Sequence, residues 1–340
     1  MTTSLRVEAT VVIPVYNDNH NLELCLSALS KSTSNHFEVL IVDDGSTEPV
    51  KPLVDYFGYR YLLIDGPRGP ARARNRGVPH TDAEFVIFID ADVCVHPNTI
   101  DRFLQAFSDN TELAAVIGSY DDTPADPGFI SQYRNLLHRY THCQSAGEVT
   151  TFWTGCGAMR RDIFLKHGGF NEKRYPKPMI EDIELGTWIS AKGGRILLDP
   201  TIQCKHLKRW SFVNMVKTDI FQRGIVWVDL MLRSNKLIQN LNVSWSQRLS
   251  VGLIFIAAIL AALTFWWPWS LIGAALALMA VTAVNMKFYQ FFAKYRSPWF
   301  AIKSLPLHWV YFGCCGVSVI VGTLKFYLSK NEKSEESFVS

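Results

Sequence analysis

Residues 84–92 of the chain read EFVIFIDAD, a run of β-branched and aromatic side chains followed by two aspartates one residue apart. A short apolar run of this kind predicts a buried β-strand. Carboxylates placed directly after a strand can hold a divalent cation, because hard oxygen ligands suit Mg²⁺ or Mn²⁺. An Asp-x-Asp pair alone is weak, since aspartates also cap helices and order turns.

Similar apolar runs lie on both sides of this stretch and alternate with helical patterns. We predict strands at residues 10–16, 38–42, 59–64, 84–89 and 113–119, and helices at residues 21–30, 97–107, 129–142 and 181–192. The alternation predicts an α/β fold with a doubly wound, mostly parallel sheet. In such sheets, ligands bind at the carboxyl ends of the strands.

Acidic residues occur where this fold would place a ligand. Asp43 and Asp44 follow the second predicted strand, and Asp90 and Asp92 follow the fourth. Glu181 and Asp182 open a later helix. Three acidic groups at such positions are more specific than any one of them, although a carboxylate at a helix start is also favoured by the helix dipole.

The C-terminal third predicts membrane helices. Residues 249–286 and 305–324 contain no Asp, Glu, Lys or Arg. The first run is too long for one crossing, and WWPW at residues 266–269 predicts a turn at its middle. We therefore expect about three spans. Earlier in the chain, we expect a short strand at residues 195–198. The spans are placed at residues 249–267, 269–286 and 305–326. A polar tail follows at residues 329–340, and we expect it to be disordered from Asn331.

Basic residues suggest how these spans are oriented. The expected loop at residues 287–303 is basic, and basic loops stay in the cytosol. Residues 1–9 lack the pattern of a signal peptide, so we expect a multi-pass protein of the inner membrane with a cytosolic N-terminal domain. Residues 208–248 form an expected amphipathic linker, either at the membrane surface or packed as an ordinary helix.

Charge and cysteine content exclude other classes. The net charge of +3 gives no case for nucleic acid, and the seven cysteines show no C-x-x-C pairing that would predict a zinc site or a disulfide framework.

Five motifs in order carry a resemblance to a known family. They are VIPVYN at residues 12–17, VDDGS at 42–46, ARNRG at 73–77, DAD at 90–92 and ED at 181–182. This series resembles family 2 glycosyltransferases, which are inverting enzymes of the GT-A fold, over about residues 10–206. The resemblance implies a hexosyltransferase-type enzyme of the cell envelope, with a GT-A domain at residues 1–207 and a helical membrane anchor at 249–328.

The same resemblance implies roles for single residues. A nucleotide-sugar would be bound by Pro14, Tyr16, Asn17, Asp43, Asp44, Arg74 and Asp90. Asp92, with Asp90, would bind Mg²⁺ or Mn²⁺. Asp182, beside Glu181, would be the catalytic base. For Arg74, an ordinary surface cation is the alternative.

Three further features complete the candidate site. His206 is a candidate metal ligand, since imidazole can bind Mn²⁺, or else a structural histidine. Trp153 could stack on a sugar or acceptor, and Gly155 and Gly157 could let backbone approach a ligand. A tight turn beside a core tryptophan is the alternative for these three.

The expected reaction moves one sugar from a UDP- or GDP-sugar to a lipid or polyprenyl-phosphate acceptor at the cytosolic membrane face. Processive relatives carry Q-x-x-R-W, whereas Ile225 stands here in place of that arginine, which disfavours a polysaccharide synthase. A membrane-anchored binding protein without turnover is the other alternative, and the intact acidic residues argue against it.

Overall fold

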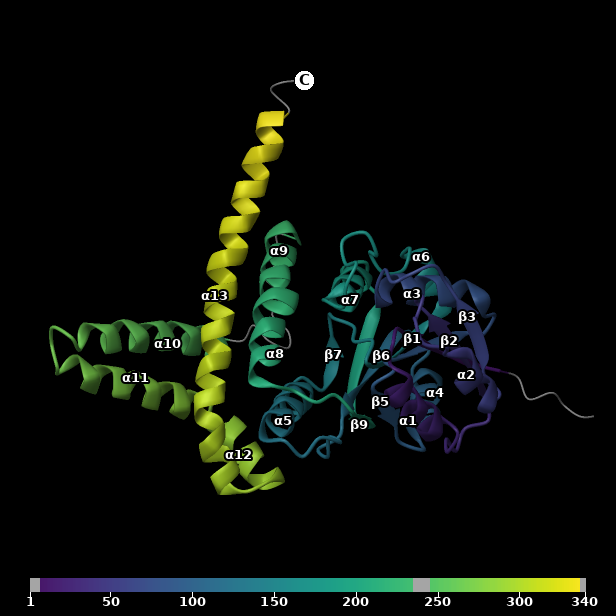
Figure 1. The fold of residues 1–340 in the computed structure, drawn as a ribbon, viewed down its shortest axis with the longest axis horizontal. Coiled ribbons are helices and arrows are strands. Elements are labelled where there is room, and N and C mark those ends of the chain that lie inside the picture. Colours follow the sequence, from purple (N-terminus) through teal and green to yellow (C-terminus); the bar gives the residue numbers. More distant parts are fainter. Residues whose placement is uncertain (1–6, 235–244, 337–340) are drawn as a thin grey trace, which may run out of the picture. The chain divides into compact units, whose positions relative to one another are not determined.

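The computed structural model describes residues 7–234 and 245–336, and the chain forms two compact units, Met1–Arg209 and Trp210–Ser340 (Figure 1). Residues 235–244 of the expected linker and 337–340 of the expected tail lie outside the described residues.

The first unit is built on one nine-stranded sheet. Its strands are β1 (Ala9–Val15), β2 (Phe37–Asp43), β3 (Arg60–Leu63), β4 (Phe85–Ile89), β5 (Val93–Val95), β6 (Leu113–Tyr120), β7 (Gly147–Val149), β8 (Cys156–Arg160) and β9 (Arg195–His206). The order is β3-β2-β1-β4-β8-β6-β9-β5, with β7 beside β9. Strands β5, β7 and β8 pair antiparallel to their neighbours, and the others run in one direction. This is the GT-A arrangement, a mixed sheet in which parallel strands dominate, and it confirms the predicted fold class.

Helices cover the sheet. In this unit they are α1 (Asn19–Leu29), α2 (Lys51–Tyr56), α3 (Pro70–Gly77), a 3₁₀ turn (Val78–His80), α4 (Thr99–Asp109), α5 (Phe129–Gln144), α6 (Arg161–Lys166) and α7 (Glu181–Ala191). The predicted helix at 97–107 begins two residues later than expected, so Pro97 precedes it.

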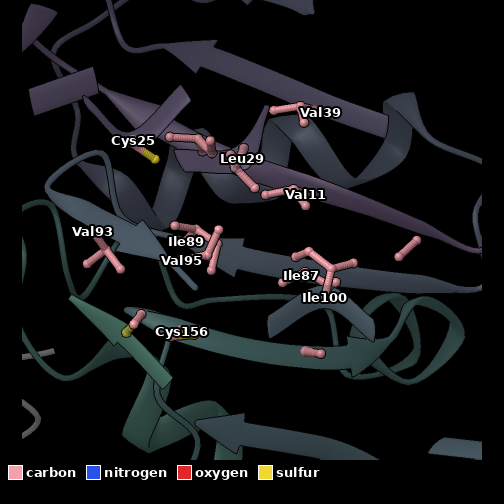
Figure 2. Close-up of a cluster of buried hydrophobic side chains, with 14 of the residues drawn as sticks. Val11, Cys25, Leu29, Val39, Ile87, Ile89, Val93, Val95, Ile100 and Cys156 are labelled. Carbon is pink, nitrogen blue, oxygen red and sulfur yellow. The ribbon is translucent and has the colours of Figure 1, made fainter. Parts of the chain in front are cut away.

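The central strands are buried on both faces. Every residue of β4 is buried, which explains why residues 85–89 show no polar alternation. Figure 2 shows Cys25 and Leu29 of α1 beside Val11, Ile87 and Ile89.

Strand β9 is longer than the short strand predicted at residues 195–198. It pairs with β6 at Leu198 and again at Gln203, with an irregularity between them. Pro200 lies in that irregularity, where a missing N–H costs no ladder hydrogen bond. The strand therefore continues to His206.

The second unit is helical. Its elements are α8 (Phe212–Lys217), the π-helical segment η2 (Thr218–Gly224), α9 (Ile225–Ser234), α10 (Trp245–Leu263), α11 (Ser270–Val284), α12 (Met286–Tyr295) and α13 (Pro298–Glu336). Two helices, Trp245–Leu263 and Pro298–Leu328, are long and apolar enough to cross a membrane. Taken together, α11 and α12 are also long and apolar enough, but the two helices are bent by 64° relative to one another.

Two expectations for this unit were wrong. The basic stretch expected as a loop at 287–303 is mostly helical, because Phe288 and Phe292 recur at helical spacing and are buried. The tail expected to be disordered from Asn331 continues α13 to Glu336, since residues 325–336 contain no glycine or proline to end a helix.

Candidate active site

The predicted acidic residues gather at one edge of the sheet. Val15 of β1 lies opposite Asp43 of β2, and the Val15 carbonyl accepts a hydrogen bond from the Asp44 N–H at 2.9 Å. Strand β4, paired with β1 on its other side, ends at Ile89, directly before Asp90. The sheet therefore brings two of the acidic motifs to a common edge, as the sequence predicted.

Asp44 organises the loop that follows β3. Its Oδ2 accepts hydrogen bonds from the N–H groups of Arg68 (2.8 Å) and Gly69 (2.7 Å). Its Oδ1 is buried, has no hydrogen-bond partner, and lies 3.9 Å from the Arg72 guanidinium. Burial raises the pKa of this carboxyl, against the lowering effect of the two N–H donors. Asp44 thus has one oxygen that accepts no hydrogen bond from the described residues.

Asp43 and Asn17 instead order the neighbouring turn. The Asp43 carboxylate accepts from Ser46 N–H at 2.8 Å and from the Tyr61 hydroxyl at 2.7 Å. Asn17 has a φ of 50°, and its Oδ1 accepts from Thr47 N–H at 2.8 Å. These contacts give both residues a local structural role.

The two aromatic and cyclic residues of the first motif differ in exposure. Tyr16 follows β1 and is 44% exposed, so a ligand can reach its ring. Pro14 is partly buried within β1.

Arg74 joins two of the acidic motifs. Nη2 donates to Asp90 Oδ1 at 2.5 Å, and Nη1 donates to Glu181 Oε1 at 3.1 Å. Its side chain is 3% exposed, so the alternative of a surface cation was wrong. Burial alone would lower the pKa of the guanidinium, but Asp90 and Glu181 outweigh it and raise the pKa.

Glu181 and Asp182 form a buried acidic pair at the start of α7. Burial and the neighbouring Asp182 raise the pKa of Glu181 to about 7, against the lowering effect of Arg74. Burial also raises the pKa of Asp182. Two adjacent carboxyls with raised pKa values are typical of a site that moves protons near neutral pH.

Thr154 positions Asp182. The Asp182 Oδ2 accepts from the Thr154 N–H at 3.0 Å and from its hydroxyl at 3.2 Å. This contact depends on Gly186, because a Cβ there would lie 2.1 Å from the Phe152 nitrogen. Only glycine lets α7 approach the segment that carries Thr154.

Asp92 and His206 form the remaining part of the site. The register of β5 and β9 places Val93 opposite His206, and His206 Nε2 lies 3.6 Å from Asp92 Oδ2. The pKa of Asp92 is lowered, because His206 and Lys208 outweigh its burial. The His206 ring stacks on Tyr120, with centroids 4.4 Å apart.

A cavity of about 620 Å³ opens beside Asp92. It is lined by Asp18, His20, Asn21, Leu24, Asp92, Ala125, Asp126, Pro127, Leu207, Lys208 and Arg209. Among the described residues, no group of three His, Cys, Asp or Glu side chains could hold a metal ion. Asp92 and His206 are thus a pair of potential cation ligands, not a complete set.

Trp153 belongs to an aromatic cluster within the unit. Its ring lies edge-on to Tyr120, with centroids 4.8 Å apart, and near His138. A Cβ at Gly155 would lie 2.4 Å from the Trp153 ring, and one at Gly157 would lie 2.3 Å from the Trp153 carbonyl. Both glycines thus make room for Trp153.

Sequence reasoning missed Thr154 and Tyr120. Thr154 stands between the two residues already singled out at 153 and 155, so its position was the available signal. Nothing in the sequence marked Tyr120, which is the last residue of a strand that resembles the other buried strands.

Comparisons with known proteins agree with the fold. Residues 10–168 match the family model of glycosyl transferase family 2. The glycosyltransferase AglE of Haloferax volcanii is 32% identical over 113 residues, which are 31% of this chain and 37% of AglE. An uncharacterised glycosyltransferase of Haemophilus influenzae is 27% identical over 48% of this chain and 56% of its own length. The chain thus spans about a third to a half of these relatives.

One solved structure matches nearly the whole chain. The mannosyltransferase PcManGT from Pyrobaculum calidifontis, in complex with GDP-Man and Mn²⁺, superposes with a TM-score of 0.57 at 20% identity. The match covers 96% of this chain and 89% of that protein. At this identity the likeness shows the fold alone.

Proposed function

Because residues 10–168 match the family model of glycosyl transferase family 2, we propose that this chain is an inverting glycosyltransferase with a nucleoside diphosphate sugar as donor. The observation that carries the proposal is the bridge made by Arg74 between Asp90 and Glu181. It joins the acids that would bind the donor to the acids that would activate the acceptor.

The proposed donor pocket lies around Asp44 and Tyr16. The buried Asp44 Oδ1 without a partner can accept the N–H of a nucleobase, and the exposed Tyr16 ring can lie against the base. Asp90 would accept a ribose hydroxyl. Arg74 would set the position of Asp90 and balance the charge of the acidic pair, since its guanidinium is committed to these carboxylates.

Asp182 is the proposed general base. It would take the proton of an acceptor hydroxyl as the oxygen attacks the anomeric carbon and the nucleoside diphosphate leaves from the opposite face. Burial raises the pKa of Asp182, which makes its carboxylate a stronger base, and Thr154 holds the carboxylate in place. An acceptor that is already a phosphate anion would need no base.

We infer that the site takes a divalent cation. Asp92 and His206 would hold Mg²⁺ or Mn²⁺, with the donor diphosphate and water as further ligands. When bound, the cation would neutralise charge on the departing diphosphate. PcManGT, which has a similar fold, is named as a complex with Mn²⁺ and GDP-Man, which supports a divalent cation and a nucleoside diphosphate sugar as donor.

The acceptor we propose is a lipid, either one with a free hydroxyl or a polyprenyl phosphate. The apolar helices of the second unit support it, because they would hold the enzyme at a membrane. From the basic stretch at 287–303, we propose that the enzyme lies in the inner membrane with its GT-A unit in the cytosol. Ile225, in place of the arginine of processive relatives, supports transfer of a single sugar.

The test is a transfer assay with the full chain in detergent and a membrane lipid extract, using a panel of UDP- and GDP-sugars with and without Mn²⁺. We expect one donor to be consumed, with its sugar recovered in the lipid fraction only when the cation is present. Asp55→Asn, a surface change on α2, is the matched control for Asp92→Asn. Donor binding without turnover of any sugar would instead identify a binding protein.

A further inference from the structure

Helix α13 is long and apolar enough to cross a membrane, but its contacts with neighbouring helices argue against that role. Gly224 of η2 lies against Ser318 of α13, where a Cβ would come within 2.2 Å of the Ser318 hydroxyl. One turn further on, a Cβ at Gly322 would lie 2.9 Å from Val228 of α9. Small residues on both helices therefore hold α13 parallel to η2 and α9 in close contact.

The helices that α13 contacts carry charges along their length. Lys217 and Arg223 are exposed, and Asp229 and Arg233 form a pair at 3.0 Å. The Arg233 guanidinium also lies 5.7 Å from the Phe326 ring of α13. A segment with this many charges cannot cross the hydrocarbon core of a bilayer.

If α13 crossed the membrane, its contacts with η2 and α9 would set the depth of their charged side chains in the bilayer. Centred on its uncharged run, 305–324, α13 would place Ser318 about 5 Å from the bilayer midplane, at 1.5 Å per residue. Gly224 packs at that level, so the neighbouring exposed Arg223 would lie deep in hydrocarbon. Such a position is strongly disfavoured for a charged side chain.

The α10–α11 hairpin has the opposite character. It contains no charged residue from 249 to 286, and its tip at residues 264–269 exposes three tryptophans. Helix α10 is about 28 Å long, close to the thickness of the core, and α11 is shorter, at about 22 Å. At the open end, Asn285 Nδ2 donates to Ser250 Oγ at 2.8 Å and ties the two helices together. Figure 1 shows α13 running across this open end.

Basic side chains lie on α12, next to the open end of the hairpin. Helix α12 bends away from α11 by 64°, buries Phe288 and Phe292, and exposes Lys287 and Lys294. The sequence has no Asp or Glu between Asp229 and Glu332, so no acid of that stretch balances these lysines. An amphipathic helix with this charge suits the headgroup region of an anionic bilayer.

We propose that, among the described helices, only the α10–α11 hairpin crosses the membrane. Helices α12 and α13, with α8, η2 and α9, form a layer on the membrane surface at the open end of the hairpin, in contact with anionic headgroups. The described part of the chain then crosses twice, and the C-terminal end of α13 lies on the same side as α12. Three spans at 249–267, 269–286 and 305–326 would instead place it on the other side.

The test uses the full chain with an epitope tag at one of three positions: between Trp267 and Pro268, after Arg296, or after Ser340. Protease is added to sealed membrane vesicles of both orientations. We expect the tags after 296 and 340 to be removed from one face and the tag at 267 from the other. Removal of the tags at 267 and 340 from the same face would overturn the proposal.

The untagged chain provides a check against disturbance by the tags. Trypsin cleavage after Lys294 and after Lys330 or Lys333, identified by mass spectrometry, should occur from the same face of sealed vesicles. In reconstituted vesicles, cleavage after Lys294 should be slower with phosphatidylglycerol than with phosphatidylcholine alone. Cleavage from opposite faces would overturn the two-crossing topology, and equal rates would overturn the contact with anionic lipid.

Discussion

Arg74 donates a hydrogen bond of 3.1 Å to Glu181, although 107 positions separate the two residues in the chain. Both side chains are almost fully buried, and the same guanidinium also pairs with Asp90. A buried ion pair is costly to break, because the remaining charge has neither water nor partner. This link therefore gives the proposed site both its shape and its charge balance.

Loss of Arg74 should destabilise the first unit. Arg74→Met leaves the acids Asp90, Glu181 and Asp182 without their cation, and we expect a loss of about 3–5 kcal/mol. Adding Glu181→Gln to that variant should recover part of the loss, as thermal unfolding would show. Arg76→Met, on the same helix but paired with Glu172 at the surface, should change stability by less than about 1 kcal/mol. Equal effects of Arg74→Met and Arg76→Met would contradict the role of the bridge.

Glu181 should make stability depend on pH. Its pKa rises from the ordinary glutamate value of 4.5 to about 7 in the folded chain. Between these values the folded chain keeps a proton that the unfolded chain has lost, so stability falls as pH rises, by no more than about 3 kcal/mol. Melting temperatures of the native chain and of Glu181→Gln should therefore diverge from pH 5 to pH 8, in favour of the glutamine variant. Parallel curves would rule out a raised pKa.

Asp182→Asn should slow turnover by about 10²–10⁴ and leave donor affinity nearly unchanged, because the base acts on the acceptor. The asparagine carbonyl can still accept from Thr154 N–H, so the start of α7 should persist. Calorimetry of donor binding beside kcat separates the two roles. Weak binding together with early melting would identify a structural residue. A small change in kcat would point to a phosphate acceptor, which needs no base.

Asp92→Asn should abolish transfer while the chain still folds, because an amide offers a cation only one neutral oxygen. His206→Gln should lower the affinity for Mn²⁺, so that transfer needs a higher Mn²⁺ concentration but is not abolished. The measurements are transfer rate against Mn²⁺ concentration and the melting temperature. An Asp92→Asn enzyme with an unchanged Mn²⁺ response would refute the assignment.

Gly186→Ala should cost both stability and activity. Its new methyl group would meet the Phe152 backbone at 2.1 Å and push α7 away from Thr154. The expected destabilisation is about 1–3 kcal/mol, as for other overpacked cores. Gly252→Ala is the matched control, since it adds a methyl group to helix α10 with no atom within 4 Å. Equal melting temperatures for both variants would show that α7 tolerates the shift.

The sequence alone determined the parts that depend on local patterns. Runs such as residues 85–89 predicted buried strands, because a strand covered on both faces must be apolar throughout. The acids after β2 and β4 predicted the edge of the sheet that carries the site. Uncharged runs predicted the hairpin turn near Pro268, since charge and helix breaking are properties of neighbouring residues.

Only the tertiary structure decided which side chains meet. The bridge from Arg74 to Glu181, the support of Asp182 by Thr154 and the stacking of Tyr120 on His206 join residues far apart in the chain. The hydropathy of α13 predicted a span, whereas its contacts with η2 led us to the opposite proposal. Local composition records what a segment can bury, but the partner against which it is buried is set by long-range packing, which no local pattern encodes.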